Sequence, residues 1–221
     1  MASTATGCLA EKSSADVIIQ IAKPVLRQKK LFLVTKRVFD IVCSFLGLLI
    51  LAIPMMIIAL IITIDSPGAP IFKQERLGIN GKPFMIYKFR SMRLDAEVNG
   101  PQWADEQDPR CTHFGQILRR TRLDELPQFY NILRGDMSFV GPRPERAYFY
   151  GEFEKYIPGF SNRLIVVPGL TGYAQVNGGY SLKPEEKIIY DMEYIEHRSV
   201  LMDVKCIIKT VSLIFTHEGA R

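Results

Sequence analysis

Residues 41–64 form the feature that most constrains the fold, because twenty-four consecutive positions there carry no charged side chain. An apolar run of this length is a candidate membrane segment. As one straight helix it would be about 36 Å long, against a hydrocarbon core of about 30 Å. The run begins too far into the chain for an ordinary secretory signal, and Lys36 and Arg37 stand just before it.

Pro54 lies near the middle of this run and removes a backbone hydrogen-bond donor. The carbonyl of Ile50 then lacks its helical partner, which is costly in lipid unless another group binds it. A break at Pro54 leaves two arms of about 20 Å and 16 Å, each too short to cross a bilayer. Periodicity alone favours one spanning helix with a proline kink. The alternative is a re-entrant helix–break–helix that enters and leaves the same leaflet.

The charge distribution favours the re-entrant alternative. Residues 1–37 carry seven Lys or Arg and two acids, which accounts for the whole net charge of +5, while the other 184 residues carry 21 charges of each sign. A basic flank favours the cytoplasmic side of a membrane. The polar region after residue 65 also has a cytosolic character, so both ends of the run are predicted on one side. A nucleic-acid-binding domain normally carries its excess charge on the folded body, so we expect no nucleic-acid partner.

The composition limits the remaining possibilities. A length of 221 residues suits one domain with an appendage, and 48% apolar with 23% charged residues argue against extended disorder. The four cysteines are far apart and include no C-x-x-C pair, and the three histidines are scattered. This pattern argues against a disulfide scaffold, a zinc knuckle and a histidine metal cage, and it fits a reducing compartment.

The region after the apolar run mixes strand and helix patterns. Alternating segments at 70–78 and 82–90 flank Asn80-Gly81, a strong signal for a β-hairpin. Residues 95–110 are polar and predicted as loop. Helical patterns cover 112–122, Pro127 to Gly135, 184–197 and 200–215. The predicted fold class is therefore α+β, with a small, mostly helical domain and a short β-hairpin attached to an N-terminal re-entrant segment.

Asp124 and Glu125 are the leading candidates for chemistry. If a helix begins at Pro127, both carboxylates lie at its positive end, where the dipole lowers their pKa and keeps them ionised. Two ionised carboxylates near arginines can hold Mg²⁺ together with phosphate oxygens, and a carboxylate can attack phosphorus. Ordinary helix capping explains the same pair and, for these two residues alone, is the favoured interpretation.

Three further segments offer candidate binding groups. Arg143 stands between two prolines, so a stiff backbone directs its guanidinium as bidentate phosphate binding requires, although a rigid structural turn explains it equally. Residues 168–178 form a glycine-punctuated loop whose amides can read a nucleotide base or sugar hydroxyls, but the loop lacks a P-loop spacing. Lys88 and Arg90 carry charge near where lipid head groups would lie, or they belong to a solvated face of the hairpin.

Taken together, these residues resemble the monotopic phosphoglycosyl transferases, the bacterial sugar transferase family that initiates glycoconjugate assembly. The matching segments occur in family order and leave residues 1–35 outside the match. They are Lys36 to Asp40, Pro54, Phe72 to Gly78, Lys88 to Met92, Asp108 to Arg110, Leu123 to Gln128, Gly135 to Glu145 and Pro168 to Gly178.

The resemblance implies a reaction in which sugar-1-phosphate passes from a UDP-sugar to a polyprenol phosphate such as undecaprenyl phosphate, releasing UMP. It implies that Asp124 attacks the sugar-bearing phosphorus and holds the phosphosugar covalently. It also implies that Glu125 assists and that both carboxylates bind Mg²⁺. The implied phosphate-binding residues are Arg119, Arg143, Lys88 and Arg90, and the implied nucleotide-sugar-binding residues are Pro168, Gly169, Gln175 and Asn177.

The resemblance further implies a monotopic protein on the cytoplasmic face of the bacterial inner membrane, with membrane lipid as a partner. The predicted regions are a basic arm at 1–35, a re-entrant helix at 36–65 and a cytosolic catalytic domain at 66–221. The sequence does not name the sugar and leaves the oligomeric state open, so a homo-oligomer is allowed.

Two positions depart from the family pattern. Ile53 stands where a serine often precedes the helix-breaking proline, and Ser44 is too far along the helix to replace it simply. Val167 stands where the family often has a basic residue.

Two other functions compete with the transferase: a membrane-anchored scaffold for glycan enzymes, and a glycosidase using Asp124 and Glu125. Adjacent residues rarely give the carboxyl separation of about 5–10 Å that glycoside hydrolysis needs, so the glycosidase ranks last.

Overall fold

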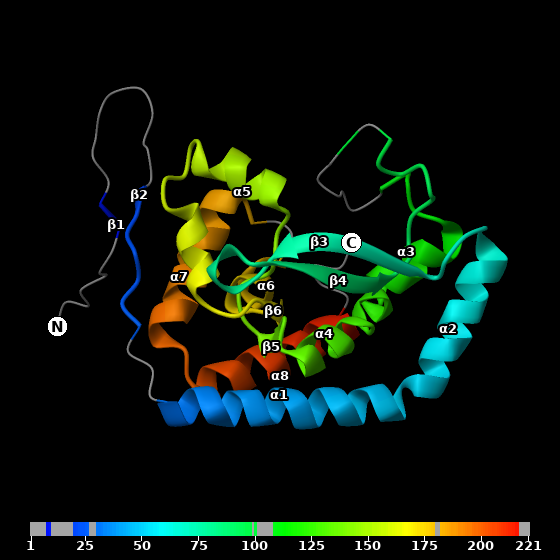
Figure 1. Ribbon diagram of the computed structural model, residues 1–221, viewed down its shortest axis with the longest axis horizontal. Helices are drawn as coiled ribbons and strands as arrows, with labels where there is room; N and C mark the ends of the chain where they lie inside the picture. The colour runs from blue at the N-terminus through cyan, green and yellow to red at the C-terminus, as the bar shows by residue number, and fades with distance from the viewer. Residues whose placement is uncertain are drawn as a thin grey trace.

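The structure is a computed structural model that describes residues 8–9, 20–26, 30–98, 100, 108–179 and 182–216. Most of the predicted basic arm and part of the predicted loop at 95–110 therefore lie outside the described residues. A long helix runs along one side of the molecule, a second helix rises from its end, and a mixed body of helices and small sheets lies above the first (Figure 1). This mixed architecture confirms the predicted α+β class.

Helices and short strands are interspersed along the chain. The α-helices are α1 (Lys30–Ile50), α2 (Ala52–Asp65), α3 (His113–Arg120), α4 (Gln128–Arg134), α5 (Ala147–Glu154), α6 (Tyr173–Asn177), α7 (Pro184–His197) and α8 (Val200–Thr216). The short 3₁₀ helices are η1 (Ile79–Gly81), η2 (Leu123–Glu125) and η3 (Phe160–Ile165). The strands are β1 (Cys8–Leu9), β2 (Gln20–Ile21), β3 (Ile71–Leu77), β4 (Pro83–Phe89), β5 (Ser138–Val140) and β6 (Gly169–Thr171).

The apolar run is broken, but the break is at Leu51 and not at Pro54 as the sequence predicted. The chain bends by 61° at this break between α1 and α2. Pro54 lies in the first turn of α2, where its missing N–H leaves no gap in the helix ladder. Its ring clashes with the carbonyl four residues earlier, at Ile50, so the distortion falls in the turn before the proline. Ser44 bonds the carbonyls of Asp40 and Ile41 and does not repair the break.

Within the described ranges, no single helix combines the length and apolar character needed to cross a membrane. Only α1 and α2 together reach that length and composition, as a bent pair. The re-entrant interpretation is consistent with this bend, and insertion into lipid stays a prediction.

Polar side chains near the middle of α1 bind the body. Arg37 donates to the carbonyls of Ile132 and Leu133 at 2.7 and 2.8 Å, so it caps the end of α4. Asp40 is 3% exposed and accepts hydrogen bonds from the Ser138 hydroxyl and the Phe139 amide. The basic flank before the apolar run therefore binds protein groups, and α1 is docked on α4 and β5.

The second helix is docked as well. Ile58 and Ile62 of α2 are buried against Phe89 and Leu118, from β4 and α3. Arg90 is also buried, and it donates to the carbonyls of Ser66 and Pro67 at 2.6 and 2.7 Å. These bonds satisfy carbonyls just past the C-terminal end of α2, where a cation is electrostatically favoured.

The predicted hairpin is confirmed. Strands β3 and β4 pair antiparallel, with Ile71 opposite Phe89 and Leu77 opposite Pro83. Asn80 and Gly81 have φ values of 56° and 74°, the left-handed conformation that this dipeptide tolerates best. The predicted helices are also present, and α7 has the predicted bounds of 184–197.

Strands β5 and β6 form a small parallel sheet. Ser138 of β5 pairs with Gly169 of β6, and Val140 pairs with Thr171. A Cβ at position 169 would lie 2.1 Å from the Gly141 amide nitrogen, so only glycine fits. This sheet fixes the backbone that leads into Arg143.

Candidate active site

Asp124 and Glu125 lie in η2, a single 3₁₀ turn between α3 and α4. Helix α4 begins at Gln128 with Pro127 as its N-cap, one residue later than predicted, so the two carboxylates do precede the helix start. Arg122 directly precedes the turn with φ of 58°, a conformation that turns the chain sharply and carries strain in a non-glycine residue. The turn brings both carboxylates into the body, where Asp124 and Glu125 are 8% and 9% exposed.

Glu125 is held by two cations. Its Oε1 atom lies 2.8 Å from Lys88 Nζ and 2.5 Å from Arg143 Nη2. Burial alone would raise the pKa of Glu125, but the charges of Arg143 and Lys88 outweigh it and lower the pKa well below its usual value. Glu125 is therefore ionised and fixed in position at neutral pH.

Asp124 has the opposite environment. Over the part of the chain that the structure describes, no hydrogen bond or ion pair holds its carboxylate. Burial raises the pKa of Asp124 to about 6, the charge of Lys88 opposes this rise, and the neighbouring Glu125 charge adds to it. The sequence-based expectation of a lowered pKa is wrong for Asp124, because burial outweighs the favourable charges. An ionised carboxylate with free lone pairs is well suited to attack an electrophile.

Arg119 approaches the pair from α3. Its charge favours the ionised form of Asp124, and its Nη1 atom donates to Cys111 Sγ at 3.0 Å. The same nitrogen lies 3.9 Å from Asp108, whose carboxylate is bound mainly by Arg110. The structure thus places Arg143 and Lys88 on Glu125 and Arg119 near enough for its charge to act on Asp124, and their phosphate-binding role stays a prediction.

Arg90 does not join this group. Its guanidinium nitrogens bind backbone and side-chain oxygens at the end of α2. The structure therefore gives Arg90 a capping role in place of the predicted phosphate contact. Lys88 lies within β4 and reaches Glu125, whereas Arg90 lies just past the end of that strand.

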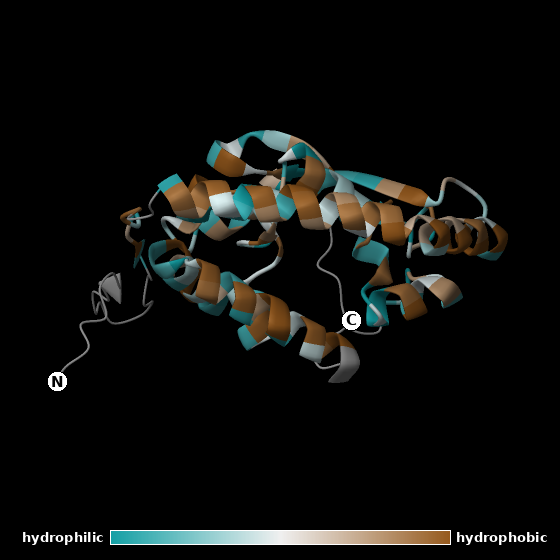
Figure 2. Ribbon diagram, turned by 90° about the horizontal axis from the view of Figure 1, so that it is seen from below, coloured by the Kyte–Doolittle hydropathy of each residue, from teal (hydrophilic) through white to brown (hydrophobic). Residues whose placement is uncertain are grey.

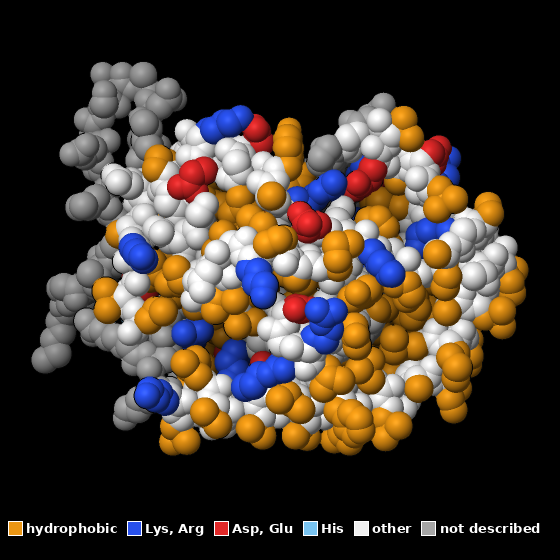
Figure 3. Space-filling view, in the orientation of Figure 1, with side chains coloured by type: hydrophobic (Ala, Val, Ile, Leu, Met, Phe, Trp, Pro, Cys, Tyr) orange, Lys and Arg blue, Asp and Glu red, His pale blue; other side chains and the backbone are white. Residues whose placement is uncertain are grey.

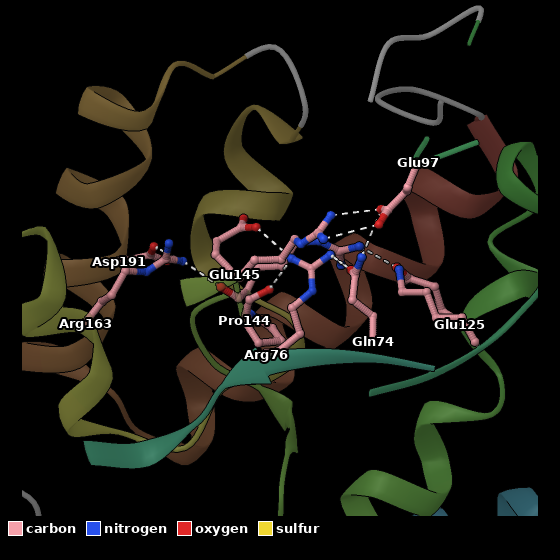
Figure 4. A network of polar contacts seen from close by, with 11 residues as sticks. Gln74, Arg76, Glu97, Glu125, Pro144, Glu145, Arg163 and Asp191 are labelled. Atoms are coloured by element: carbon pink, nitrogen blue, oxygen red, sulfur yellow. Dashed lines mark hydrogen bonds and ion pairs between the residues drawn. The ribbon is translucent and has the colours of Figure 1, made fainter. Parts of the chain in front are cut away.

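Behind Arg143 a network of polar contacts extends into the body (Figure 4). Figure 4 shows Glu125 at one end of this network and the Arg163–Asp191 pair at the other. Arg143 links the two ends, because its side chain binds Glu125 at 2.5 Å and its carbonyl accepts a hydrogen bond from Arg163 at 3.0 Å. Arg163 in turn lies 2.6 Å from Asp191, and Arg76 binds Glu145 at 3.0 Å within the same network. Sequence reasoning missed Arg163, Asp191 and Glu145, because single charged residues in separate elements form no local motif.

A small cavity borders this network, and Arg143 is part of its lining. Its lining residues are Arg122, Arg143, Arg163, Ala174, Gln175, Gly179, Lys187 and Asp191. Of the predicted nucleotide-sugar residues, only Gln175 lines this cavity. Asn177 binds the Tyr173 carbonyl and Lys209, while Pro168 and Gly169 form backbone hydrogen bonds with β5 and Pro142.

The two carboxylates suit a magnesium ion only in part. Among the described residues, no group of three or more His, Cys, Asp or Glu side chains could hold a metal. Mg²⁺ commonly binds one or two protein carboxylates and completes its shell with water and substrate phosphates. Asp124 and Glu125 fit that smaller requirement, since no residue in the described part of the chain forms a hydrogen bond or ion pair with the Asp124 oxygens.

Comparison with known proteins supplies the family. A model of the family described as "Bacterial sugar transferase" matches residues 31–217, which cover the site and both long helices. The chain belongs to the bacterial sugar transferase family. The match begins at the start of α1 and ends at the end of α8, so the docked helices are part of what defines these sugar transferases.

Individual relatives support the assignment. The chain is 42% identical over 189 residues to the Aeromonas hydrophila UDP-N-acetylgalactosamine-undecaprenyl-phosphate N-acetylgalactosaminephosphotransferase, covering 84% of this chain and 45% of that protein. It is also 42% identical to the Escherichia coli (strain K12) UDP-glucose:undecaprenyl-phosphate glucose-1-phosphate transferase, covering 84% and 41%. The chain thus spans less than half the length of these two relatives. The exopolysaccharide production protein PSS of Rhizobium leguminosarum bv. phaseoli is 43% identical, covering 81% and 94%.

Proposed function

We propose that this sugar transferase moves sugar-1-phosphate from a UDP-sugar to a polyprenol phosphate such as undecaprenyl phosphate, in two steps through Asp124. The observation that carries the proposal is the asymmetry of the carboxylate pair: two cations fix Glu125, whereas no hydrogen bond or ion pair among the described residues holds Asp124. The names of the relatives, which combine a UDP-sugar with undecaprenyl phosphate, support this donor and acceptor.

In the first step, an Asp124 carboxylate oxygen attacks the phosphorus that bears the sugar. A bond forms between that oxygen and phosphorus, and the bond from phosphorus to the bridging diphosphate oxygen breaks. UMP leaves with the bonding electrons. In the second step, a phosphate oxygen of the polyprenol phosphate attacks the same phosphorus and releases the Asp124 carboxylate, giving polyprenyl diphosphate sugar.

The surrounding charges support both steps. Phosphoryl transfer depends on positioning and on neutralising the charge of the phosphoryl oxygens. Arg143 and Lys88 are fixed by Glu125, so they present positive charge without reorganising, and Arg119 adds a third cation. A Mg²⁺ ion bound by Asp124 and Glu125 would neutralise the donor diphosphate and assist the departing UMP.

We further propose that α1 and α2 enter and leave the cytoplasmic leaflet of the bacterial inner membrane. Apolar side chains cover the lower edge and one end of the molecule (Figure 3). The ribbon coloured by hydropathy shows hydrophobic residues along the long helices in the view from below (Figure 2). Exposed large apolar patches of this kind mark interaction or membrane surfaces. The exposed residues include Leu49, Ile50, Ile53, Met56, Leu60 and Ile64 on α1 and α2, and Leu201, Val204, Ile208 and Val211 on α8.

The chemical proposal is tested by Asp124→Asn. We expect this variant to release no UMP from any UDP-sugar, whereas the wild-type chain in membranes or nanodiscs releases UMP with at least one sugar in a panel. Without acceptor lipid, intact mass spectra of the wild type should show an added phosphosugar that is absent from Asp124→Asn. Full turnover by the Asp124→Asn variant would exclude Asp124 as the nucleophile. A wild type that releases no UMP would favour the scaffold alternative.

The membrane proposal is tested by thiol labelling from outside sealed, right-side-out membrane vesicles. We expect cysteines introduced at Gln20 and Asp95, two exposed positions on opposite sides of the apolar run, to be protected equally and to react together after permeabilisation. Reaction of one site alone before permeabilisation would mean that the helix pair crosses the membrane.

A further inference from the structure

Arg143 belongs to two sites at once. Its Nη2 atom binds Glu125 at 2.5 Å, and its side chain also lines the small cavity behind the carboxylates. A group bound in that cavity would therefore lie beside a guanidinium that also binds Glu125. This arrangement suits the part of the donor that leaves when the phosphorus is attacked.

The cavity favours an anion. Arg122, Arg143, Arg163 and Lys187 contribute four positive charges to its lining, and Asp191 contributes one negative charge. Arg163 is only 1% exposed and is fixed, since its Nη2 atom donates to the Arg143 carbonyl at 3.0 Å. Its Nε and Nη1 atoms have no hydrogen-bond partner within the described ranges. Buried guanidinium N–H groups without acceptors are costly, and a phosphate oxygen would satisfy them.

Gln175 adds an uncharged hydrogen-bond acceptor to the lining of the cavity. Its Nε2 atom donates to the Leu170 carbonyl at 3.0 Å, which fixes the orientation of the amide. Its Oε1 atom is then turned away from that carbonyl, and it is buried with no donor among the residues that the structure describes. A carbonyl oxygen repels phosphate oxygens and binds an N–H or O–H group.

We infer that this cavity binds the nucleoside monophosphate half of the donor, which becomes the leaving group. The phosphate lies among Arg143, Arg163 and Lys187, and a base N–H or ribose hydroxyl donates to Gln175 Oε1. An inorganic anion would use only the cationic groups, whereas a nucleotide uses both kinds of group. The inference rests on the proposed function and specifies which residues hold the nucleotide.

The test is equilibrium binding of UMP, and separately of inorganic phosphate, to the full-length chain purified in detergent. Gln175→Met keeps the side-chain length and removes the acceptor. We expect it to weaken UMP binding about tenfold, the effect of one lost hydrogen bond to a buried group, and to leave phosphate binding unchanged. Lys187→Met should weaken both. The matched control is Gln116→Met, the same change at an exposed position on α3 outside the cavity.

Thermal unfolding of each variant separates lost binding from lost structure. A Gln175→Met variant that melts like the wild type and binds UMP equally well would overturn the role of Gln175, and equal binding by Lys187→Met as well would overturn the subsite. If Gln175→Met does not fold, the binding of inorganic phosphate to Lys187→Met provides the test in its place. UMP binding requires no turnover, so a chain that binds UMP through these residues but transfers no sugar would contradict the proposed function alone.

Discussion

The ammonium group of Lys36 lies 2.7 Å from the carboxylate of Asp203, joining the first long helix to the last. Both side chains are largely buried, and the other Asp203 oxygen accepts a hydrogen bond from Tyr194 at 2.8 Å. The sequence alone assigns Lys36 to a basic flank at the membrane surface. In the fold its charge is neutralised by protein, so this ion pair helps to set how α1 lies on the body.

The Lys36–Asp203 pair should be coupled in stability. Lys36→Met leaves a largely buried carboxylate without its cation, so we expect the free energy of unfolding to fall by about 2–4 kcal/mol. Asp203→Asn alone should also destabilise, because it leaves the ammonium group unpaired. The double variant should lose clearly less than the sum of the single losses in thermal or denaturant unfolding. Additive losses would mean that the two charges do not interact.

The packing of α1 on α4 should depend on Gly47. A Cβ at this position would lie 2.4 Å from the ring of Phe129, which itself packs on Phe139. Gly47→Ala should therefore destabilise by about 1–3 kcal/mol, although alanine favours helix. Gly151→Ala in α5 is the matched control, because a Cβ there meets nothing within 4 Å, and it should be neutral or stabilising. Equal melting temperatures for the two variants would contradict the contact.

The rate of UMP release should depend on the ionisation of Asp124. Because its pKa is about 6 and the attacking form is the carboxylate, the rate should be half-maximal near pH 6 and fall about tenfold per pH unit well below that. Lys88 is the strongest influence that lowers this pKa, so Lys88→Met should move the midpoint to higher pH. A rate that stays flat from pH 7 to pH 5 would conflict with this assignment.

The two carboxylates should contribute to stability with opposite signs. The folded pKa of Asp124 lies above its ordinary value of 3.8, so ionisation destabilises the fold as the pH rises from about 4 to 6. Asp124→Asn should therefore be more stable than the wild type at pH 7, by up to about 3 kcal/mol, and nearly equal to it below pH 4.

Glu125→Gln should show the reverse. The folded pKa of Glu125 is lowered, so its contribution to stability is present above the ordinary value of 4.5 and is lost as the pH falls below it. At pH 7 the variant leaves Lys88 and Arg143 without their shared anion, and we expect a loss of about 1–3 kcal/mol. Melting curves of both variants at pH 7 and at pH 4 provide the check. A shift in the same direction for both would contradict the asymmetry of the pair.

Local patterns in the chain were sufficient for much of the fold. The alternating segments around Asn80-Gly81 predict the hairpin because a tight turn and period-two strands depend only on neighbouring residues. Helix α7 could be bounded to the residue, since Pro184 suits a first helical turn and the acids that follow favour its positive end. The order of the motifs pointed to the family, which the comparisons then showed.

The sequence by itself determined which segments are helix, strand or apolar run, and which two carboxylates are the best candidates for the chemistry. Only the tertiary structure decided what those charges do. It turned Arg37 onto the end of α4, gave Arg90 to the end of α2, and raised the pKa of Asp124 by burial. It also assembled a cationic cavity from residues as distant as Arg122 and Lys187. The physical reason is that burial and long-range pairing set the energy of a charge, and neither can be read from neighbouring residues.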